Sequence, residues 1–252
     1  MNAPLLLETR ALCKRFGGLA ATDAVSLGIR RGECHAVIGP NGAGKTTLIS
    51  QLFGSLHPDS GTVHFGGHDV TDLNAHQRAM LGFARSFQIT SILGDFSVID
   101  NVGIAVQAVS GSSFRFWRPV ADDTELVAKA QTILRQVGLE TRASRQAQNL
   151  SHGEHRQLEI ALALATRPQL LLLDEPMAGM GPDESERMVQ LISGLKGHYT
   201  VLLVEHDMDA VFRLADRISV LVAGRVIATG SVDEIRANPE VKSAYLGEEA
   251  KN

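Results

Sequence analysis

The sequence predicts an α/β fold in which short buried strands alternate with helices, and three observations support this. In residues 34–56 a short apolar run stops at Gly39, a glycine-rich loop follows, and apolar side chains then recur at helical spacing. A second apolar run, Leu170–Leu173, has the length of a buried strand and ends in two carboxylates. Strand-like and helical patterns continue to alternate up to residue 238.

The composition is ordinary for a globular protein. The 252 residues are enough to bury a core, and a net charge of −4 without a long basic run gives no support for nucleic acid as the main partner. No apolar stretch approaches the roughly 18 residues that cross a bilayer, and we find no secretory signal, so we expect a cytosolic or membrane-docked protein. Of the two cysteines, Cys34 lies on a predicted strand, which favours a buried thiol over a disulfide.

The glycine-rich loop predicts a nucleoside triphosphate site. It contains Gly39, Pro40, Asn41, Gly42, Ala43, Gly44, Lys45, Thr46 and Thr47, in the pattern G-x-x-x-x-G-K-T. Glycines let backbone N–H groups turn towards phosphate oxygens, and the next helix adds its positive N-terminal end. Lys45 supplies a cation for the β- and γ-phosphates, and Thr46 supplies a hydroxyl ligand for Mg²⁺. A chance glycine-rich turn is the alternative, but the flanking strand and helix argue against it.

Asp174 and Glu175 follow the second apolar strand, where an ATPase of this type needs carboxylates. Asp174 at the strand tip can hold Mg²⁺ through water. Glu175 points to the other side of the chain and can polarise the attacking water. Taken alone this is a strand with a polar end, and the glycine-rich loop makes the catalytic interpretation the better one.

Four further elements occur in the order seen in ABC transporter ATPases, which the whole chain resembles. Gln88 resembles the glutamine that senses the γ-phosphate and contacts the permease. Residues 150–154, Leu-Ser-His-Gly-Glu, resemble the LSGGQ signature. His206 resembles the switch histidine, which would donate to the γ-phosphate and orient the water, and Phe16 resembles the aromatic residue that stacks on adenine.

The resemblance implies a P-loop NTPase fold with a RecA-like core, an N-terminal antiparallel β-subdomain and an inserted α-helical subdomain. We expect a single ATPase domain, with residues 1–88 and 160–238 as the core, 89–159 as the helical insert and 239–252 as a tail. It implies ATP and Mg²⁺ as cofactors. The implied catalytic residues are Lys45, Gln88, Glu175 and His206, and the implied Mg²⁺ ligands are Thr46, Gln88 and Asp174.

The signature segment would act on a neighbouring subunit. Ser151 and Glu154 have the spacing of a capping box, and the resulting helix N-terminus is an anion site. In ABC proteins this site belongs to the partner's nucleotide, so Ser151, Gly153 and Glu154 would bind ATP in trans. Two departures stand out: Glu154 replaces glutamine and adds negative charge near a phosphate, and Gly181 stands where most ABC proteins have aspartate.

The signature, the Ala-Gly-Met of residues 178–180 and the tail at 234–248 are similar to the LivG-type ATPases of bacterial branched-chain amino acid importers. This implies a second ATPase subunit, identical or different, two membrane permeases and an extracytoplasmic solute-binding protein. It implies a peripheral location on the cytoplasmic face of the bacterial membrane and no nucleic acid partner.

Other functions share parts of this pattern. Import of urea or other amides would use a very similar ATPase. An ABC ATPase that acts on DNA or ribosomes would carry long coiled coils or two cassettes, and only about sixty residues without sustained heptads separate Gln88 from Ser151. A GTPase would need an Asn-Lys-x-Asp motif, which is missing, and neither a GTPase nor a small kinase carries the Ser151–Glu154 element.

Overall fold

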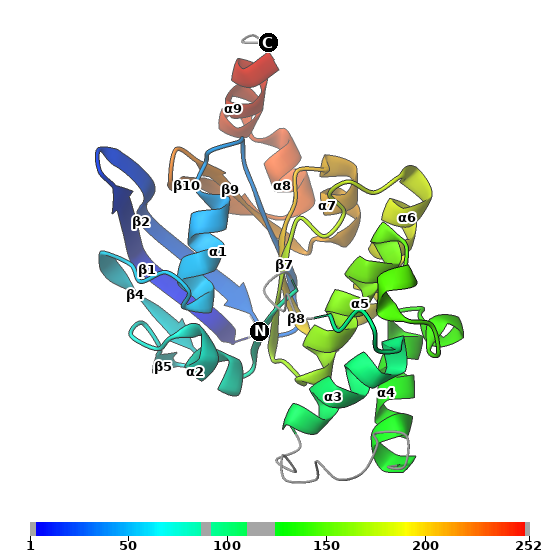
Figure 1. The fold of residues 1–252 in the computed structure, drawn as a ribbon. Helices are drawn as coiled ribbons and strands as arrows, with labels where there is room; N and C mark the ends of the chain where they lie inside the picture. The colour runs from blue at the N-terminus through cyan, green and yellow to red at the C-terminus, as the bar shows by residue number, and fades with distance from the viewer. Residues whose placement is uncertain (1–3, 87–91, 110–123, 250–252) are drawn as a thin grey trace. The chain divides into compact units, whose positions relative to one another are not determined.

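The computed structural model describes residues 4–86, 92–109 and 124–249 of the chain (Figure 1). The chain forms two compact units, and each consists of segments that are distant in sequence. Unit 1 contains residues Met1–Phe83, Leu170–Glu175 and Lys196–Asn252, and unit 2 contains Ala84–Gln169 and Pro176–Leu195. The boundaries expected for core, insert and tail stay a prediction.

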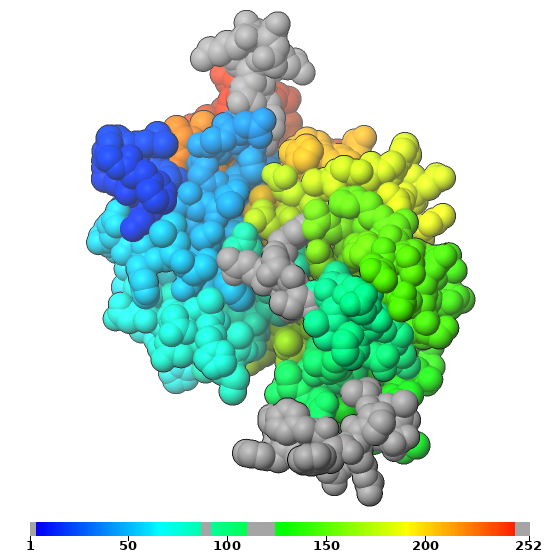
Figure 2. Space-filling view, viewed as in Figure 1, coloured from blue at the N-terminus to red at the C-terminus, as the bar shows by residue number. Residues whose placement is uncertain are grey.

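An antiparallel sheet forms the N-terminal part of unit 1, as expected. Its strand order is β2 (Leu19–Arg30), β1 (Leu5–Phe16), β4 (Ser60–Phe65) and β5 (His68–Asp69). The blue-to-cyan atoms in Figure 2 belong to the part of the chain that contains this sheet. The pattern of residues 5–8 and 12–16 predicts two short strands around a polar break, but the structure has the single strand β1. The register shifts between Thr9 and Leu12, and Ala11 has a left-handed φ of 48°, so a bulge absorbs the break.

The second sheet is mostly parallel. Its strand order is β10 (Arg225–Gly230), β9 (Arg217–Val222), β3 (Cys34–Ile38), β8 (Thr200–Val204), β7 (Leu170–Asp174) and β6 (Phe83–Arg85). Strand β3 pairs in parallel with β8 and β9, and β8 pairs in parallel with β7. Every residue of β3 and β8 is buried, as expected for parallel strands covered on both faces. Residues 218–222 and 225–229, separated by Ala223 and Gly224, predict a hairpin, and the antiparallel pair β9–β10 confirms it.

Helices accompany the sheets of unit 1: α1 (Lys45–Phe53), α2 (Ala75–Met80), α7 (Met208–Leu214), α8 (Val232–Ala237) and α9 (Pro239–Glu249). Ser231 and Glu234 have the sequence spacing of a capping box that opens α8. The structure confirms it, because the Ser231 hydroxyl accepts from the Glu234 N–H and the Glu234 carboxylate accepts from the Ser231 N–H. Helix α2 was not predicted, although Asn74 and Gln77 form a capping box that opens it. Both cysteines are free, and burial raises the pKa of the Cys34 thiol to about 12.

Unit 2 is helical in the residues that the structure describes. Its α-helices are α3 (Val98–Val109), α4 (Thr124–Gln136), α5 (His152–Ala165) and α6 (Pro182–Leu195). Helix α4 buries Leu126, Ala130 and Leu134, which lie one turn apart, and α3 and α5 both contact it. Glycines at 94, 103 and 111 and the serines at 112–113 interrupt residues 89–121 and predict an irregular, partly helical segment, whereas the structure has a continuous helix over Val98–Val109. Across the described ranges, we find no helix long and apolar enough to span a membrane.

Arg78 joins helix α2 to the C-terminal end of α1. Its guanidinium is fully buried and donates to the carbonyl oxygens of Gln51 at 2.7 Å and Leu52 at 2.6 Å. It also donates to Leu73 O at 3.0 Å and Thr71 O at 2.9 Å. A cation at a helix C-terminus satisfies carbonyl groups that have no partner within the helix. Burial lowers the pKa of Arg78 to about 10.

We therefore predict that Arg78→Met destabilises the protein by about 3 kcal/mol or more, because it leaves several buried carbonyl groups without a donor. Urea unfolding measures this change. Arg135→Met, on the exposed face of α4, is the matched control and should cost little. Equal stability of the two variants would contradict a role for Arg78 in holding α1.

Candidate active site

Three of the predicted site segments meet at one edge of the parallel sheet. Val37 of β3 and Asp174 of β7 both pair with Val204 of β8, so these three neighbouring strands end at the same level. The glycine-rich loop follows β3, Glu175 follows β7 and His206 follows β8 by two residues. The carboxyl ends of parallel strands are the usual position of a ligand site in an open α/β sheet.

The loop is held by close packing of two glycines. A Cβ on Gly39 would lie 2.0 Å from the Leu221 carbonyl oxygen, and a Cβ on Gly44 would lie 1.9 Å from that of Ala21. Gly44 also has a φ of 102°, which L side chains rarely adopt. These contacts with β9 and β2 fix the loop at the start of α1. Gly44 is the N-cap of α1 and provides no side-chain cap, so the first helical N–H groups point out as donors.

Lys45 carries the positive charge of this loop. Its ammonium donates to Gly39 O at 2.6 Å and to Pro40 O at 3.0 Å, and the residue is buried. Thr46 follows in the first turn of α1 and is exposed. The loop therefore joins a fixed ammonium group, helix N–H donors and an accessible hydroxyl, a combination that fits an anionic oligophosphate and a hard cation.

Glu175 and His206 lie close together beyond the ends of β7 and β8. His206 Nδ1 is 3.9 Å from Glu175 Oε1, and the two side chains are 62% and 43% exposed. Glu175 has a left-handed φ of 48°, and its N–H donates to Val204 O at 2.8 Å. Such a conformation costs about 1–3 kcal/mol in a residue other than glycine, and strain of this kind clusters at functional sites.

Buried Glu205 orients the His206 backbone. Its Oε2 accepts from the His206 N–H at 3.0 Å and lies 3.7 Å from His206 Nδ1. The sequence analysis did not assign Glu205 a role. A carboxylate directly after an apolar strand and beside a candidate histidine was the available signal.

Phe16 is an exposed aromatic side chain at the end of β1, 51% accessible. The Lys14 ammonium lies 6.0 Å from its ring centroid. The β1–β2 hairpin turns after Phe16, and Ala21 then packs on Gly44 of the loop. The fold thus connects this aromatic residue to the loop through only a few residues.

The signature segment belongs to unit 2 and opens helix α5. The Ser151 hydroxyl accepts from the Glu154 N–H at 3.3 Å, and Glu154 Oε2 accepts from the Ser151 N–H at 2.9 Å. The predicted capping box is therefore present. Gly153, the second residue of the helix, is buried.

Comparison with known proteins identifies the family. The sequence profile described as "ABC transporter" matches residues 22–178, which is more than half of the chain. The chain belongs to the ABC transporter family. Membership implies ATP binding and hydrolysis and agrees with the predicted α/β fold.

Individual ABC proteins resemble the chain over nearly its full length. The "high-affinity branched-chain amino acid transport ATP-binding protein LivG" of Salmonella typhimurium is 41% identical, covering 98% of this chain and 100% of that protein. LivG of Escherichia coli K12 is 39% identical with the same coverage. BraF of Pseudomonas aeruginosa, whose name also gives branched-chain amino acid transport, is 37% identical. A second profile, "Branched-chain amino acid ATP-binding cassette transporter", matches residues 225–251.

Solved ABC cassettes share the fold. A nucleotide-free ATP-binding cassette from an ABC transporter is 31% identical with a TM-score of 0.83, covering 96% of this chain and 99% of that one. An ATP-binding cassette crystallised in its ADP conformation is also 31% identical, with a TM-score of 0.85 and coverage of 97% and 100%.

Within this ABC protein, the charge of Glu154 is compensated locally. Arg142 Nε donates to Glu154 Oε1 at 2.6 Å. Burial acts to raise the pKa of Glu154, but hydrogen bonds from the Ser151 N–H and from Arg142 outweigh it and lower the pKa below its usual value. The carboxylate that departs from the signature is thus paired with a cation. The sequence analysis missed Arg142, since nothing in its local pattern points to a residue twelve positions away.

The structure does not show the position of Gln88 or a bound Mg²⁺ ion. Gln88 lies outside the described residues. Thr46 and Asp174 lie in unit 1, and within the described residues no cluster of three or more His, Cys, Asp or Glu side chains could hold a metal. A Mg²⁺ site made of one hydroxyl, one carboxylate, phosphates and water needs no such cluster, so the residues present fit that cation.

We predict that Arg142→Gln raises the pKa of Glu154. Because the folded-state pKa of Glu154 is lowered, its contribution to stability is present above the unfolded-state pKa and is lost as the pH falls through the folded-state value. In the variant this contribution should be smaller, and its loss should be complete at a higher pH. Carbon-13 NMR of the glutamate carboxyls measures the pKa, with Arg135→Gln as control. The same Glu154 pKa in both variants would show that Arg142 does not set it.

Proposed function

We propose that this chain is the ATP-hydrolysing subunit of an ABC importer for branched-chain or other hydrophobic amino acids. One observation supports ATP hydrolysis most strongly. The loop of residues 39–47, held by the close packing of its glycines, lies at the same edge of the sheet as Asp174, Glu175 and His206. The names of the relatives and the profile at residues 225–251 support the amino acid cargo over urea, other amides or nucleic acid.

The loop would bind the triphosphate. Its backbone N–H groups and the N-terminus of α1 would surround the phosphate oxygens, and the Lys45 ammonium would exchange its carbonyl partners for the β- and γ-phosphates. Exposed Phe16 would stack on adenine. Thr46, Asp174 and Gln88 would hold Mg²⁺, which supplies neutralisation of developing charge on the phosphates when bound.

Hydrolysis would depend on the strained residue Glu175. Its carboxylate would accept a proton from the attacking water, and the left-handed backbone would hold it in position at the strand end. His206 would donate to the γ-phosphate and orient the same water, with Glu205 fixing the His206 backbone. Gln88 would sense the γ-phosphate.

The second half of each pocket would come from another ATPase subunit, identical or different. Ser151, Gly153 and Glu154 would meet the partner's γ-phosphate, so that two ATP molecules favour a closed pair and hydrolysis reopens it. Closure would move two membrane permeases docked near residues 88–97. The chain would then be a peripheral subunit on the cytoplasmic face of the membrane, in a system with an extracytoplasmic solute-binding protein.

Two variants separate binding from hydrolysis. Lys45→Ala should abolish ATP binding in calorimetry, whereas Lys242→Ala, an exposed control on α9, should not. Glu175→Gln should bind ATP but turn over at least about a hundredfold more slowly, on the scale of lost general-base catalysis. Unchanged affinity in the first variant would remove the nucleotide site, and near-normal turnover in the second would remove the role of Glu175.

A further inference from the structure

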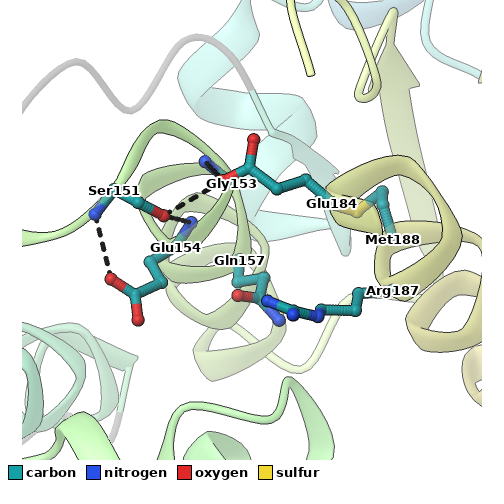
Figure 3. Close-up of a pocket in the computed structure, with 7 residues that line it drawn as sticks. All are labelled: Ser151, Gly153, Glu154, Gln157, Glu184, Arg187 and Met188. Carbon is teal, nitrogen blue, oxygen red and sulfur yellow. Dashed lines mark hydrogen bonds between the residues drawn. The ribbon is translucent and has the colours of Figure 1, made fainter. Parts of the chain in front are cut away.

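A carboxylate from helix α6 lies against the N-terminus of helix α5. Glu184, in the first turn of α6, is thirty-three residues from Ser151 in sequence. Its Oε1 accepts from the Ser151 hydroxyl at 3.2 Å and from the Gly153 N–H at 3.3 Å (Figure 3). A Cβ on Gly153 would lie 2.8 Å from the same oxygen, so glycine permits this close approach.

These contacts use the donors of the signature segment. A serine hydroxyl has one hydrogen, and that of Ser151 is directed to Glu184 while the oxygen accepts from the Glu154 N–H. The Gly153 N–H is directed to Glu184 as well. Two of the groups proposed to face the partner's γ-phosphate, the Ser151 hydroxyl and the Gly153 N–H, therefore both donate to a single carboxylate oxygen.

We propose that Glu184 is an internal substitute for that phosphate, which keeps this half-site closed until the carboxylate withdraws. The inference rests on the proposed function, because it assumes that Ser151 and Gly153 act in trans. A carboxylate and a phosphate cannot share the same two donors, and two anions at one helix N-terminus repel each other. Pairing of two ATP-bound subunits must then displace Glu184, which raises the ATP concentration that pairing needs.

The pocket around Glu184 provides a place for the displaced carboxylate. Arg187 lies three residues later on α6 and lines the same pocket, together with Gln157 of α5 (Figure 3). Residues three apart on a helix are neighbours, so rotation of the Glu184 side chain away from Ser151 can bring it to the Arg187 guanidinium. The switch needs only side-chain rotation within unit 2.

The test measures ATP-dependent association by analytical ultracentrifugation in the Glu175→Gln protein, in which hydrolysis is slowed. Adding Glu184→Gln, which removes the charge and keeps the shape, should tighten association at least about tenfold, a change of about 1.4 kcal/mol. Glu184→Asp keeps the charge and should associate no more tightly than the parent. Glu186→Gln, on the same helix, is the matched control for loss of one negative charge and should leave association unchanged.

The outcomes distinguish this inference from the proposed function. Tightening confined to Glu184→Gln supports the inference, provided that circular dichroism shows the variant folded. Equal or weaker association of Glu184→Gln would overturn it, and weaker association would mean that Glu184 positions Ser151 instead. No ATP-dependent association of the parent Glu175→Gln protein would contradict pairing between identical subunits and overturn the inference for such a pair, while nucleotide binding by the loop of residues 39–47 would stand. If Glu184→Gln fails to fold, tighter association of Glu184→Asp would overturn the inference and parent-like association would support it.

Discussion

The close packing of Gly39 and Gly44 on neighbouring strands is the constraint on which the site depends. Each glycine lies where a Cβ would be about 2 Å from a carbonyl oxygen, of Leu221 in one case and Ala21 in the other. The loop is therefore fixed between β9 and β2 before any ligand arrives. Because these donors are already in position, they need little rearrangement when the charged phosphates bind. Catalysis of phosphoryl transfer depends mainly on positioning and on electrostatic stabilisation by such preorganised groups.

Parallel register converts this local constraint into a site. Because β3, β8 and β7 end at the same level, the loop, His206 and Glu175 lie along one edge of the sheet, although 158 residues lie between Thr47 at the end of the loop and His206. This arrangement costs folding free energy locally, because Glu175 has a strained backbone and the Glu205 carboxylate is buried. The signature helix carries a separate set of donors, whose present partner is the Glu184 carboxylate of the same unit.

Much of this could be predicted from sequence, because the decisive signals are local. The strand–loop–helix of residues 34–56, the buried strand before Asp174 and the capping box at Ser151 each depend on neighbouring residues. Strand β1 was predicted as two pieces, since a bulge leaves no periodic signature. Arg78, Arg142 and Glu184 could not be assigned, because their partners lie 5 to 33 residues away and only the fold brings them together.

Titration of isotope-labelled wild-type protein with MgATP, followed by the backbone amide resonances, tests the nucleotide site most directly. We expect saturable shifts in the amides of residues 42–47, because their backbone N–H groups would receive the phosphate oxygens. Saturable binding of ATP that leaves the amides of residues 42–47 unshifted would contradict this expectation.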